Sequence, residues 1–252
     1  MPNSTTIEPV RNNGAVTAED NYTEQVTAEP QCPKSATDNM PEEVVSLVSR
    51  GKIPLFIRRA CDDDLPDVLE LVTEAKLWLP SKGTDQWSRD WADQEGRKRS
   101  DRVQDSLKGG STWVVTATYK DQTYMVATVT IELVANPLVW TRPDDPGDDS
   151  AVYLSRLIVA RSFAGLKIGA GLLNWACDYA RYIHHAKLVR IDVWTRNFTL
   201  HRYYRKQRFK DAGKCPDESY PSRALFQRST RKRTRRTPLI QPVIIDPYRA
   251  KR

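Results

Sequence analysis

The sequence predicts an α/β fold in which a mixed β-sheet carries helices on both faces. Short β-rich runs alternate along the chain with segments whose apolar residues recur at helical spacing. From residue 53 onward these segments follow in the order β-α-α-β-β-β-α-β-α-β, and this order builds a sheet that helices flank. No stretch approaches the roughly 18 consecutive apolar residues of a membrane helix, so we expect no membrane partner.

The first strand and helix are read from apolar residues and capping signals. Residues 54–60 form an apolar run that predicts a strand. The acidic run 62–64 supplies candidate N-cap residues, and the apolar positions after it keep helical spacing, at Leu65, Val68, Leu69 and Val72. Residues 76–92 hold three tryptophans, but Pro80 and Gly83 break regular structure there. This segment is expected either to line a substrate pocket or to cap the core.

A hairpin forms the middle of the predicted sheet. A polar helix at 99–108 ends at a Gly-Gly pair, and two β-rich runs follow at 112–119 and 124–134. Residues 120–123 between these runs are a hairpin turn signal. The acidic, proline-containing segment 136–150 is predicted to be a surface loop.

The last predicted elements are two strand–helix pairs and one strand. A strand at 152–159 leads into a helix at 167–184, whose apolar stripe is typical of a helix packed on a sheet. A strand at 187–193 leads into a short helix at 197–206. The run 224–227 is expected to close the sheet.

Both ends of the chain differ in composition from the middle. Residues 1–52 are rich in Thr, Asn, Glu, Pro and Ser, which predicts a disordered leader. From residue 228 onward the chain carries nine basic side chains and one acidic one, whereas the whole chain has a net charge of +7. The residues 229–252 are therefore predicted to be a basic, disordered tail, and the folded domain to span 53–228. A basic run of this kind allows contact with nucleic acid, through this tail only.

The four cysteines and three histidines lack the spacing of metal ligands, so no metal site is predicted. Unpaired thiols fit a reducing compartment. The N-terminus lacks the basic start and apolar run of a secretory signal. We therefore expect a cytoplasmic protein.

A strand-to-helix turn in the second half of the chain is suited to binding a pyrophosphate. The first N–H groups of a helix have no intrahelical partner, and the helix dipole adds about half a positive charge there. The turn begins after the strand residues Leu157, Ile158 and Val159, and it reads Ala164-Gly165-Leu166-Lys167-Ile168-Gly169-Ala170. Arg161 and Lys167 could add cations to the bound phosphates.

A second block places an asparagine and two phenols after the next strand. It reads Trp194-Thr195-Arg196-Asn197-Phe198-Thr199-Leu200-His201-Arg202-Tyr203-Tyr204. Adjacent residues on a helix point about 100° apart, so one tyrosine should face a ligand while the other packs.

Together the two blocks resemble the acetyl-CoA-binding half of the GNAT family of N-acetyltransferases. That family writes the turn as Gln/Arg-x-x-Gly-x-Gly/Ala; here Gly169 matches, while Ala164 and Lys167 depart from the first and fourth positions. Its second signature is an Asn, an aromatic residue seven positions on and then Gly-Phe, which fall here on Asn197, Tyr204 and Arg208-Phe209.

The resemblance covers roughly residues 53–228 and includes segments that look like an actinobacterial subgroup of the family, Gly83-Thr84-Asp85-Gln86-Trp87 among them. It implies a mixed, mostly antiparallel central sheet. It also implies transfer of an acetyl group to a primary amine of a small molecule or peptide, with acetyl-CoA as co-substrate and no metal. Homodimers are common among proteins that resemble this one.

The resemblance also assigns site residues. The backbone of Leu157, Ile158 and Val159 is expected to pair with pantetheine, and the turn residues Ala164, Gly165, Leu166, Lys167, Ile168, Gly169 and Ala170 to hold the pyrophosphate. Asn197 is expected to hydrogen-bond the pantetheine arm. Tyr204 is expected to contact the cofactor and to protonate the departing thiolate.

The proton chemistry fits a phenol. A thiolate has a pKa near 8.5, and a phenol with a pKa of about 10 can donate a proton across that small gap. A general base must also accept a proton from the amine, and Glu132, Asp192 and His201 are the candidates.

Two other hypotheses stay open. Ala164, Lys167 and Arg208 motivate a catalytically impaired module that binds acyl-CoA and regulates. The basic tail motivates an acetyltransferase that docks nucleic acid or an acidic protein.

Overall fold

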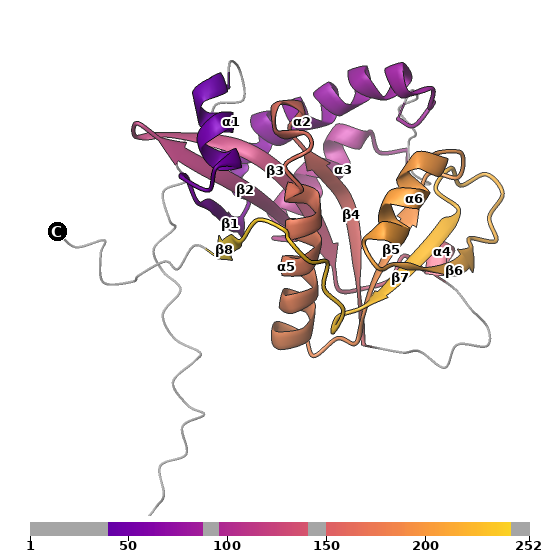
Figure 1. Ribbon diagram of the computed structural model, residues 1–252. Coiled ribbons are helices and arrows are strands. Elements are labelled where there is room, and N and C mark those ends of the chain that lie inside the picture. Colours follow the sequence, from indigo (N-terminus) through magenta and orange to yellow (C-terminus); the bar gives the residue numbers. More distant parts are fainter. Residues whose placement is uncertain (1–39, 88–95, 141–149, 243–252) are drawn as a thin grey trace, which may run out of the picture. The chain divides into compact units, whose positions relative to one another are not determined.

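The structure is a computed structural model, and it describes residues 40–87, 96–140 and 150–242, all within one compact unit of the chain. The described strands form one sheet in the order β6-β7-β5-β4-β3-β2-β1-β8 (Figure 1). The pairs β4–β5 and β1–β8 are parallel, and the other neighbouring pairs are antiparallel. The predicted mixed, mostly antiparallel sheet is confirmed.

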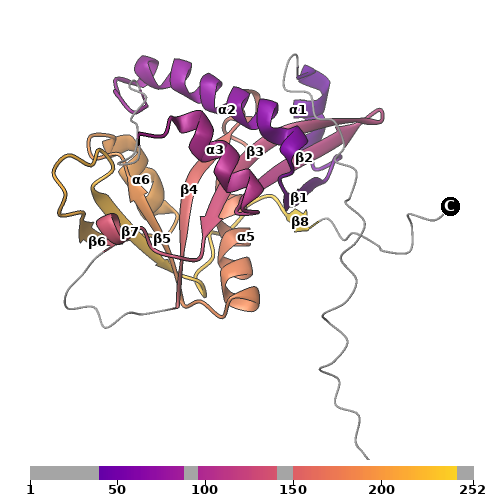
Figure 2. The same ribbon diagram turned by 180° about the vertical axis from the view of Figure 1, so that it is seen from behind.

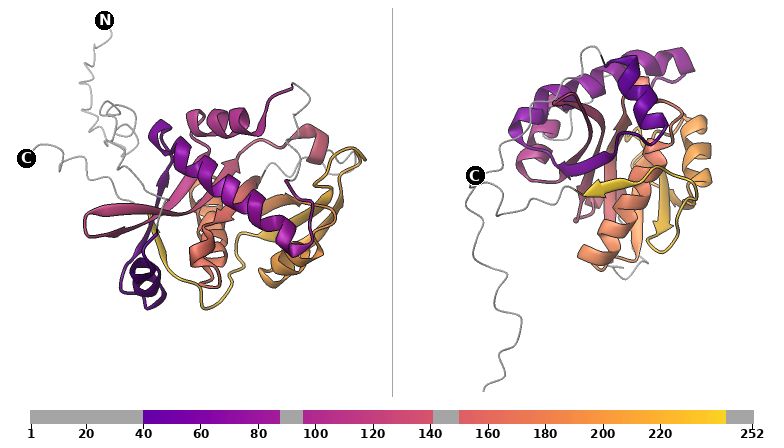
Figure 3. Two further views of the ribbon diagram at one scale, coloured as in Figure 1. Left: turned by 90° about the horizontal axis from the view of Figure 1, so that it is seen from above. Right: turned by 60° about the vertical axis from the view of Figure 1, so that its left-hand side comes forward.

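The strands are short and separated by helices or turns. They are β1 Leu55–Arg59, β2 Thr112–Tyr119, β3 Gln122–Glu132, β4 Ala151–Val159, β5 Leu188–Val193, β6 Lys210–Lys214, β7 Ala224–Ser229 and β8 Ile240–Pro242. Figures 1 and 3 show the free end of the β2–β3 hairpin projecting past the neighbouring strands.

The helices cover both faces of this sheet. They are α1 Glu42–Ser49, α2 Leu65–Trp78, α3 Arg99–Lys108, α4 Pro137–Trp140, α5 Ile168–Ile183 and α6 Phe198–Lys206, with short 3₁₀ turns η1 Asp62–Asp64, η2 Leu79–Lys82 and η3 Arg161–Phe163. Helix α5 packs on β3, β4 and β5 and lies in front of the sheet in Figure 1. Helix α2 packs on β3 and β4, and with α3 it lies in front of the opposite face in Figure 2.

Burial of one apolar stripe fixes α5 on the sheet. Ile168, Leu172, Leu173 and Ala176 recur at helical spacing and are all buried in the core. Each of the three larger side chains stabilises the fold by about 1.5–3 kcal/mol when it leaves water. The N-terminus of α5 is thereby held against β4.

The folded region is wider than the predicted span 53–228. Helix α1 lies within the segment predicted to be a disordered leader, and its Val44 is buried because the helix packs against β2. At the other end, residues 230–242 continue the fold, and β8 pairs with the edge of β1. The rest of the expected leader, residues 1–39, and the last ten residues, 243–252, lie outside the described part of the chain.

Arg228 belongs to the core and not to a solvated tail. It is only 1% exposed, its Nη2 donates to Asn174 Oδ1 at 2.6 Å, and its Nε donates to the carbonyl of Lys232 at 3.0 Å. The Asn174 amide donates in turn to the carbonyl of Thr234 and the hydroxyl of Thr237. These bonds hold the basic segment 231–237 against α5, so the expectation of a disordered tail is wrong for residues 229–242.

Two further differences concern short elements. The run 224–227 was expected to close the sheet, but β7 lies inside it because β6 pairs with its outer edge. Helix α4 lies within the predicted loop 136–150, whose residues 141–149 are not among those the structure describes. Cys177 and Cys215 are buried free thiols, whereas Cys61 is disulfide-bonded and departs from the expectation of unpaired thiols.

Candidate functional site

The two parallel strands at the centre of the sheet separate toward their carboxyl ends. β4 and β5 pair from Ala151↔Leu188 to Leu154↔Ile191 and no further. Beyond that point β4 stays with β3, as far as Ala127↔Val159, while β5 stays with β7. The edge of β4 that faces β5 therefore offers unpaired backbone groups at 155–159, into which an extended ligand can hydrogen-bond as a missing strand would.

A β-bulge accompanies this separation. The register between β3 and β4 shifts between Thr128 and Thr130, and Arg156, opposite the shift, has φ of +48°. A bulge bends a strand and re-aims its side chains. The bulge thus turns β4 away from β5 where the opening begins.

A large cavity of about 1530 Å³ occupies the opening. Its lining comes from β4, from the turn before α5, from β5 and α6, and from the segments 82–87 and 97–102. Trp78 and Trp87 line it, so these parts of the Trp-rich segment border the cavity. Trp91 lies outside the described residues.

The loop 83–87 is fastened to the β5–α6 connection. The Trp194 indole N–H donates to Asp85 Oδ1 at 2.8 Å, and Asn197 Nδ2 donates to Gln86 Oε1 at 2.7 Å. Both bonds join residues more than a hundred positions apart in sequence. They fix one wall of the cavity.

The predicted pyrophosphate turn forms part of the cavity wall. Gly165 and Lys167 both have positive φ, of +86° and +59°. The first intrahelical hydrogen bond of α5 that crosses its start runs from the Gly171 N–H to the Lys167 carbonyl at 3.0 Å. The N–H groups of Ile168, Gly169 and Ala170 therefore precede the helical ladder and can be given to an anion.

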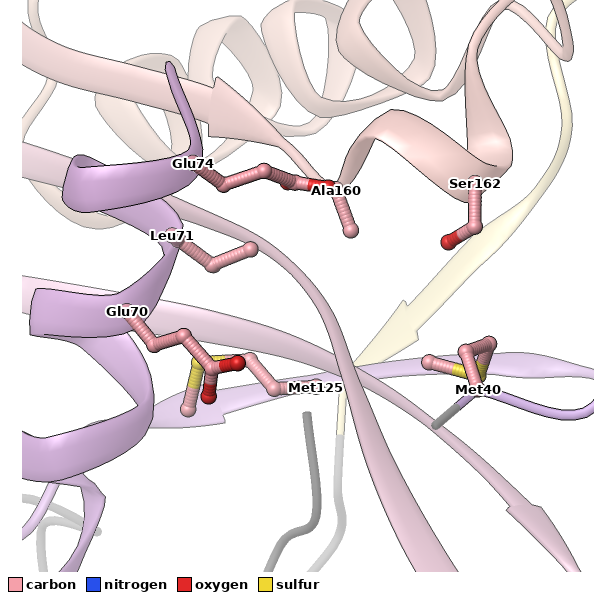
Figure 4. A pocket seen from close by; sticks show the side chains of 7 residues that line it. All are labelled: Met40, Glu70, Leu71, Glu74, Met125, Ala160 and Ser162. Carbon is pink, nitrogen blue, oxygen red and sulfur yellow. The ribbon is translucent and has the colours of Figure 1, made fainter. Parts of the chain in front are cut away.

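Two side chains place Arg161 at the start of this turn. Its backbone N–H donates to Glu74 Oε2 at 2.9 Å, and its guanidinium carbon lies 3.8 Å from the centre of the Trp78 ring. Figure 4 shows Glu74 and Glu70 projecting from α2 into a second, small cavity of about 90 Å³, next to Ala160. Glu74 therefore lines the small cavity and also binds the backbone at the start of the turn.

Gly169 allows a close approach of α6 to the turn. A Cβ at this position would lie 2.8 Å from the hydroxyl of Tyr203 and 3.5 Å from Leu157 Cδ2. Any larger residue would force the tyrosine to move. The glycine therefore lets the Tyr203 hydroxyl of α6 lie against the first turn of α5.

Most of the predicted cofactor residues border the cavity. They are Leu157, Ile158, Val159, Ala164, Gly165, Lys167, Ile168, Gly169, Asn197 and Tyr204. Leu166 and Ala170 do not line it: Leu166 packs against the core and Ala170 is buried. Their place in the site rests on their backbone N–H groups only.

Asn197 has a structural role in addition to its predicted one. It is the N-cap of α6, and its Oδ1 accepts from the Leu200 N–H at 2.9 Å. Since its Nδ2 also donates to Gln86, one amide hydrogen remains for a ligand. The predicted contact with pantetheine stays a prediction.

Tyr203 and Tyr204 both line the cavity, in different surroundings. The Tyr204 ring packs on Phe209 and Phe226 and is 4% exposed. Burial, and then the neighbouring Tyr203 and Asp192, raise the pKa of Tyr204 above its usual value near 10. Burial also raises the pKa of Tyr203, to about 12. Both phenols are protonated at neutral pH.

The three candidate general bases differ in their surroundings. His201 is buried, and its Nε2 bonds to the Trp194 carbonyl at 2.9 Å, which makes it a packing residue outside the cavity lining. Glu132 lines the cavity and accepts from Ser111 Oγ at 3.0 Å. Asp192 also lines it and accepts from Tyr220 Oη at 2.8 Å; burial raises the pKa of this carboxyl.

Sequence reasoning did not identify two polar residues of the cavity. Tyr220, from the β6–β7 connection, reaches Asp192, and Arg156 extends from the bulge. A tyrosine in a Pro- and Ser-containing loop has no distinguishing pattern. The bulge that aims Arg156 depends on pairing with β3, which a single strand sequence does not reveal.

The described residues lack two features of other protein classes, a cluster of metal ligands and a membrane-length apolar helix. Among them, no three His, Cys, Asp or Glu side chains are grouped so as to hold a metal ion. None of their helices combines the length and apolar character needed to cross a bilayer.

Comparison with known proteins identifies the family. The sequence profile of the acetyltransferase (GNAT) family matches residues 75–209, more than half of the chain. An N-acetyltransferase of uncharacterised role from Bacillus subtilis strain 168, YesJ, is 28% identical over 156 residues, which cover 60% of this chain and 79% of that protein. The expected actinobacterial subgroup stays a prediction.

Solved structures share the fold. A GNAT-family acetyltransferase from Listeria monocytogenes superimposes with a TM-score of 0.55 at 20% identity, covering 71% of this chain and 96% of the other. One from Streptococcus agalactiae gives 0.51 at 19% identity, with coverage of 71% and 96%. With the profile match, the split β4–β5 pair and the turn before α5, the chain belongs to the GNAT family of acetyltransferases.

Proposed function

We propose that this protein transfers an acetyl group from acetyl-CoA to a primary amine by direct attack in a ternary complex. The observation that carries the proposal is the continuity of the cavity. It joins the open N-terminus of α5, the unpaired edge of β4 and the side chains of Tyr204 and Asp192. A long ligand that enters at the turn would thus have its reactive end beside a phenol and a carboxylate.

The residues present fit acetyl-CoA at each part of its length. The turn offers backbone N–H groups for the phosphates, and Arg161 and Lys167 in the cavity lining add positive charge. The edge of β4 offers main-chain groups for the two pantetheine amides. Bound acetyl-CoA supplies a thioester, whose carbonyl carbon is open to attack by an amine.

Tyr204 is the proposed general acid. As the new C–N bond forms and the C–S bond breaks, its hydroxyl proton passes to the leaving sulfur, and the phenolate regains a proton from solvent. Burial keeps this phenol protonated at neutral pH. Burial also makes the difference in pKa between this phenol and a thiol larger than it is for a free phenol. Proton transfer to the leaving sulfur therefore requires that the sulfur lie close to the Tyr204 hydroxyl.

Asp192 is the proposed acceptor of the amine proton. It lies on β5 at the opening, and the hydrogen bond from Tyr220 fixes its carboxylate. A raised pKa brings a carboxylate closer to the range in which it accepts a proton efficiently. Glu132 also lines the cavity, but it lies at the end of β3, whereas Asp192 lies on β5 at the opening beside β4, which favours Asp192.

An acetylation assay on the full-length chain tests the proposal. Purified protein with acetyl-CoA and a panel of primary amines should release free CoA thiol, and mass spectrometry should show each active amine gaining one acetyl group. If acetyl-CoA binds but no amine or peptide is acetylated, the protein is the impaired acyl-CoA-binding module that Ala164, Lys167 and Arg208 suggested. Contact with nucleic acid, homodimerisation and a cytoplasmic location stay predictions.

A further inference from the structure

The part of the cavity away from the pyrophosphate turn is rich in cationic side chains. Among the described residues of the whole lining, seven are basic and only three, Glu132, Asp192 and Asp217, are acidic. Arg161 and Lys167 belong to the turn, so the excess of cations persists in the remainder. The acidic residues of the segment 144–149 lie outside the described part of the chain.

Arg156 is one of the cationic residues of this region. It is half-buried on the bulge of β4, one residue before Leu157, and it lines the cavity. Its charge interacts with Glu132, Arg102 and Asp192, and all three line the same cavity. Burial lowers its pKa to about 10, so the guanidinium is still positively charged at neutral pH.

A chain of hydroxyl groups fixes the guanidinium from one side. Arg156 Nε donates to Thr130 Oγ1 at 3.1 Å, Thr130 contacts Thr112 Oγ1 at 3.3 Å, and Thr112 donates to Ser106 of α3 at 3.0 Å. Thr130, Thr112 and Ser106 are all buried. The network connects β4 through β3 and β2 to α3 and holds the planar fork in one orientation.

The other edge of the guanidinium has no partner within the described part of the chain. Arg156 Nη1 and Nη2 make no hydrogen bond or ion pair with any residue that the structure describes, although Glu132 and Asp192 are near. Taking a charged group out of water without pairing it is costly. A fork that keeps both Nη groups open in a cavity matches the two oxygens of a carboxylate.

We infer that the acceptor amine carries a carboxylate, which pairs with the two Nη groups of Arg156 and thereby presents the amine to Asp192 and the thioester. The acceptor class is an amino acid or a closely related amino-carboxylic compound, in contrast to a polyamine. This inference rests on the proposed function. It adds a specificity-determining residue outside both signature blocks of the sequence.

The positive φ of Arg156 fits this role. A non-glycine residue at +48° costs about 1 kcal/mol or more relative to ordinary strand geometry, and such strain often lies at functional positions. Here the bulge that imposes the strain also opens β4 for pantetheine. One local distortion thus serves both substrates.

Paired ligands test the inference with the full-length protein in the presence of acetyl-CoA. Common amino acids are compared with their C-terminal amides, which keep the amine and side chain but lose the carboxylate. The free amino acids should be acetylated with kcat/KM about 100-fold above the amides. Short peptides with free and amidated C-termini distinguish a peptide carboxylate from that of a free amino acid.

Two variants assign the preference to Arg156. Arg156→Gln should reduce kcat/KM for the best amino acid by about 100-fold while the rate with its amide stays within a few-fold. Thr130→Val, which removes the anchor and keeps the charge, should raise KM for the amino acid more than it lowers kcat. Arg205→Gln is the matched control, because Arg205 pairs with Asp211 on the surface outside the cavity.

Acetyl-CoA affinity, measured by calorimetry on every variant, separates the two claims. If the wild type does not bind acetyl-CoA, that result contradicts the proposed function itself. Intact binding of acetyl-CoA with equal or better use of amides and polyamines, or with no use of any amino-carboxylic acceptor, would overturn the carboxylate inference alone. An unchanged preference in Arg156→Gln would also overturn it.

Discussion

The hydroxyl oxygen of Tyr203 lies 2.8 Å from the point that a Cβ on Gly169 would occupy. The next nearest atom to that point, Leu157 Cδ2, is 3.5 Å away, which is an ordinary contact. The phenol oxygen alone therefore fills the space that a side chain on Gly169 would need. The start of α5 and the cavity face of α6 are fitted to each other through these two residues.

This contact predicts a coupled pair of substitutions. Gly169→Ala should lower the free energy of unfolding by about 1–3 kcal/mol through overpacking against the hydroxyl, offset in part by the better helix propensity of Ala. Adding Tyr203→Phe removes the oxygen and should recover most of the loss. Urea unfolding of the two single variants and the double variant measures the coupling, and additive effects would show that the two residues do not touch.

The two residues that replace a glycine of the family signatures occupy left-handed backbone. Lys167 has φ of +59° and Arg208 has φ of +72°, at the positions where the family has glycine. The departures keep the backbone geometry that glycine favours, at a cost in strain of about 1–2 kcal/mol per residue.

We expect Lys167→Gly and Arg208→Gly each to raise the free energy of unfolding by about 0.5–1 kcal/mol, because relief of strain exceeds the added entropy of the unfolded chain. Lys167→Gly should also weaken acetyl-CoA binding a few-fold at low salt, since it removes a cation from the turn. Arg208→Gly is outside the cavity lining and should leave affinity unchanged. A destabilised Arg208→Gly protein would contradict the left-handed geometry.

The roles of Tyr203 and Tyr204 can be distinguished by replacing each tyrosine with phenylalanine. Tyr204→Phe should lower turnover by roughly 10- to 1000-fold, in line with the loss of a general acid, while acetyl-CoA affinity stays near that of the wild type. Tyr203→Phe should have the smaller effect on kcat, because its hydroxyl lies at the turn beside Gly169. Steady-state kinetics with calorimetric affinities decides between them, and the reverse order of effects would assign the chemistry to Tyr203.

Asp192 links stability to pH. Burial raises the pKa of its carboxyl in the folded protein above the unfolded value near 3.9, so the folded state binds the proton more tightly. The contribution of this residue is then most favourable below about pH 4 and declines as pH rises through the folded pKa.

Asp192→Asn should therefore increase stability at neutral pH, and the gain should vanish near pH 3.5, where both side chains are uncharged. Thermal melts across this pH range give the comparison. If Asp192 accepts the amine proton, the same variant should lose activity while it gains stability. Full activity in Asp192→Asn would transfer the role to Glu132 or to solvent.

The elements with strong local signals were predicted to within a few residues. The helix at 99–108 and the strand at 112–119 have the observed bounds because a Gly-Gly pair separates a polar, helix-forming run from a β-branched one. Strand β6 was not predicted, because only Ala212 of its five residues is buried and the strand has no apolar alternation. β8 is three residues long and exists only because the edge of β1 is available to pair.

In the candidate site, too, the parts with local sequence patterns were predicted and the parts that depend on tertiary contacts were not. The turn before α5 and the Asn197–Tyr204 block follow short-range patterns, and the structure brings both to one cavity. The fork of Arg156 and the Asp192–Tyr220 bond arise where a bulge and a distant loop meet β4 and β5. Contacts of that kind depend on tertiary pairing and leave no periodic trace in the sequence. The burial of Arg228 was not predicted for the same reason, since its partner Asn174 is 54 residues away in the sequence.

The most direct test of the account is a calorimetric titration of acetyl-CoA into the full-length protein and its Gly169→Glu variant. We predict binding near micromolar for the wild type. The variant should show none, because the new carboxylate would repel the phosphates and displace Tyr203 at the start of α5. Circular dichroism confirms that the variant remains folded. Equal affinity in a folded Gly169→Glu protein, or no binding to the wild type, would contradict the assignment of this turn as the site that holds the co-substrate.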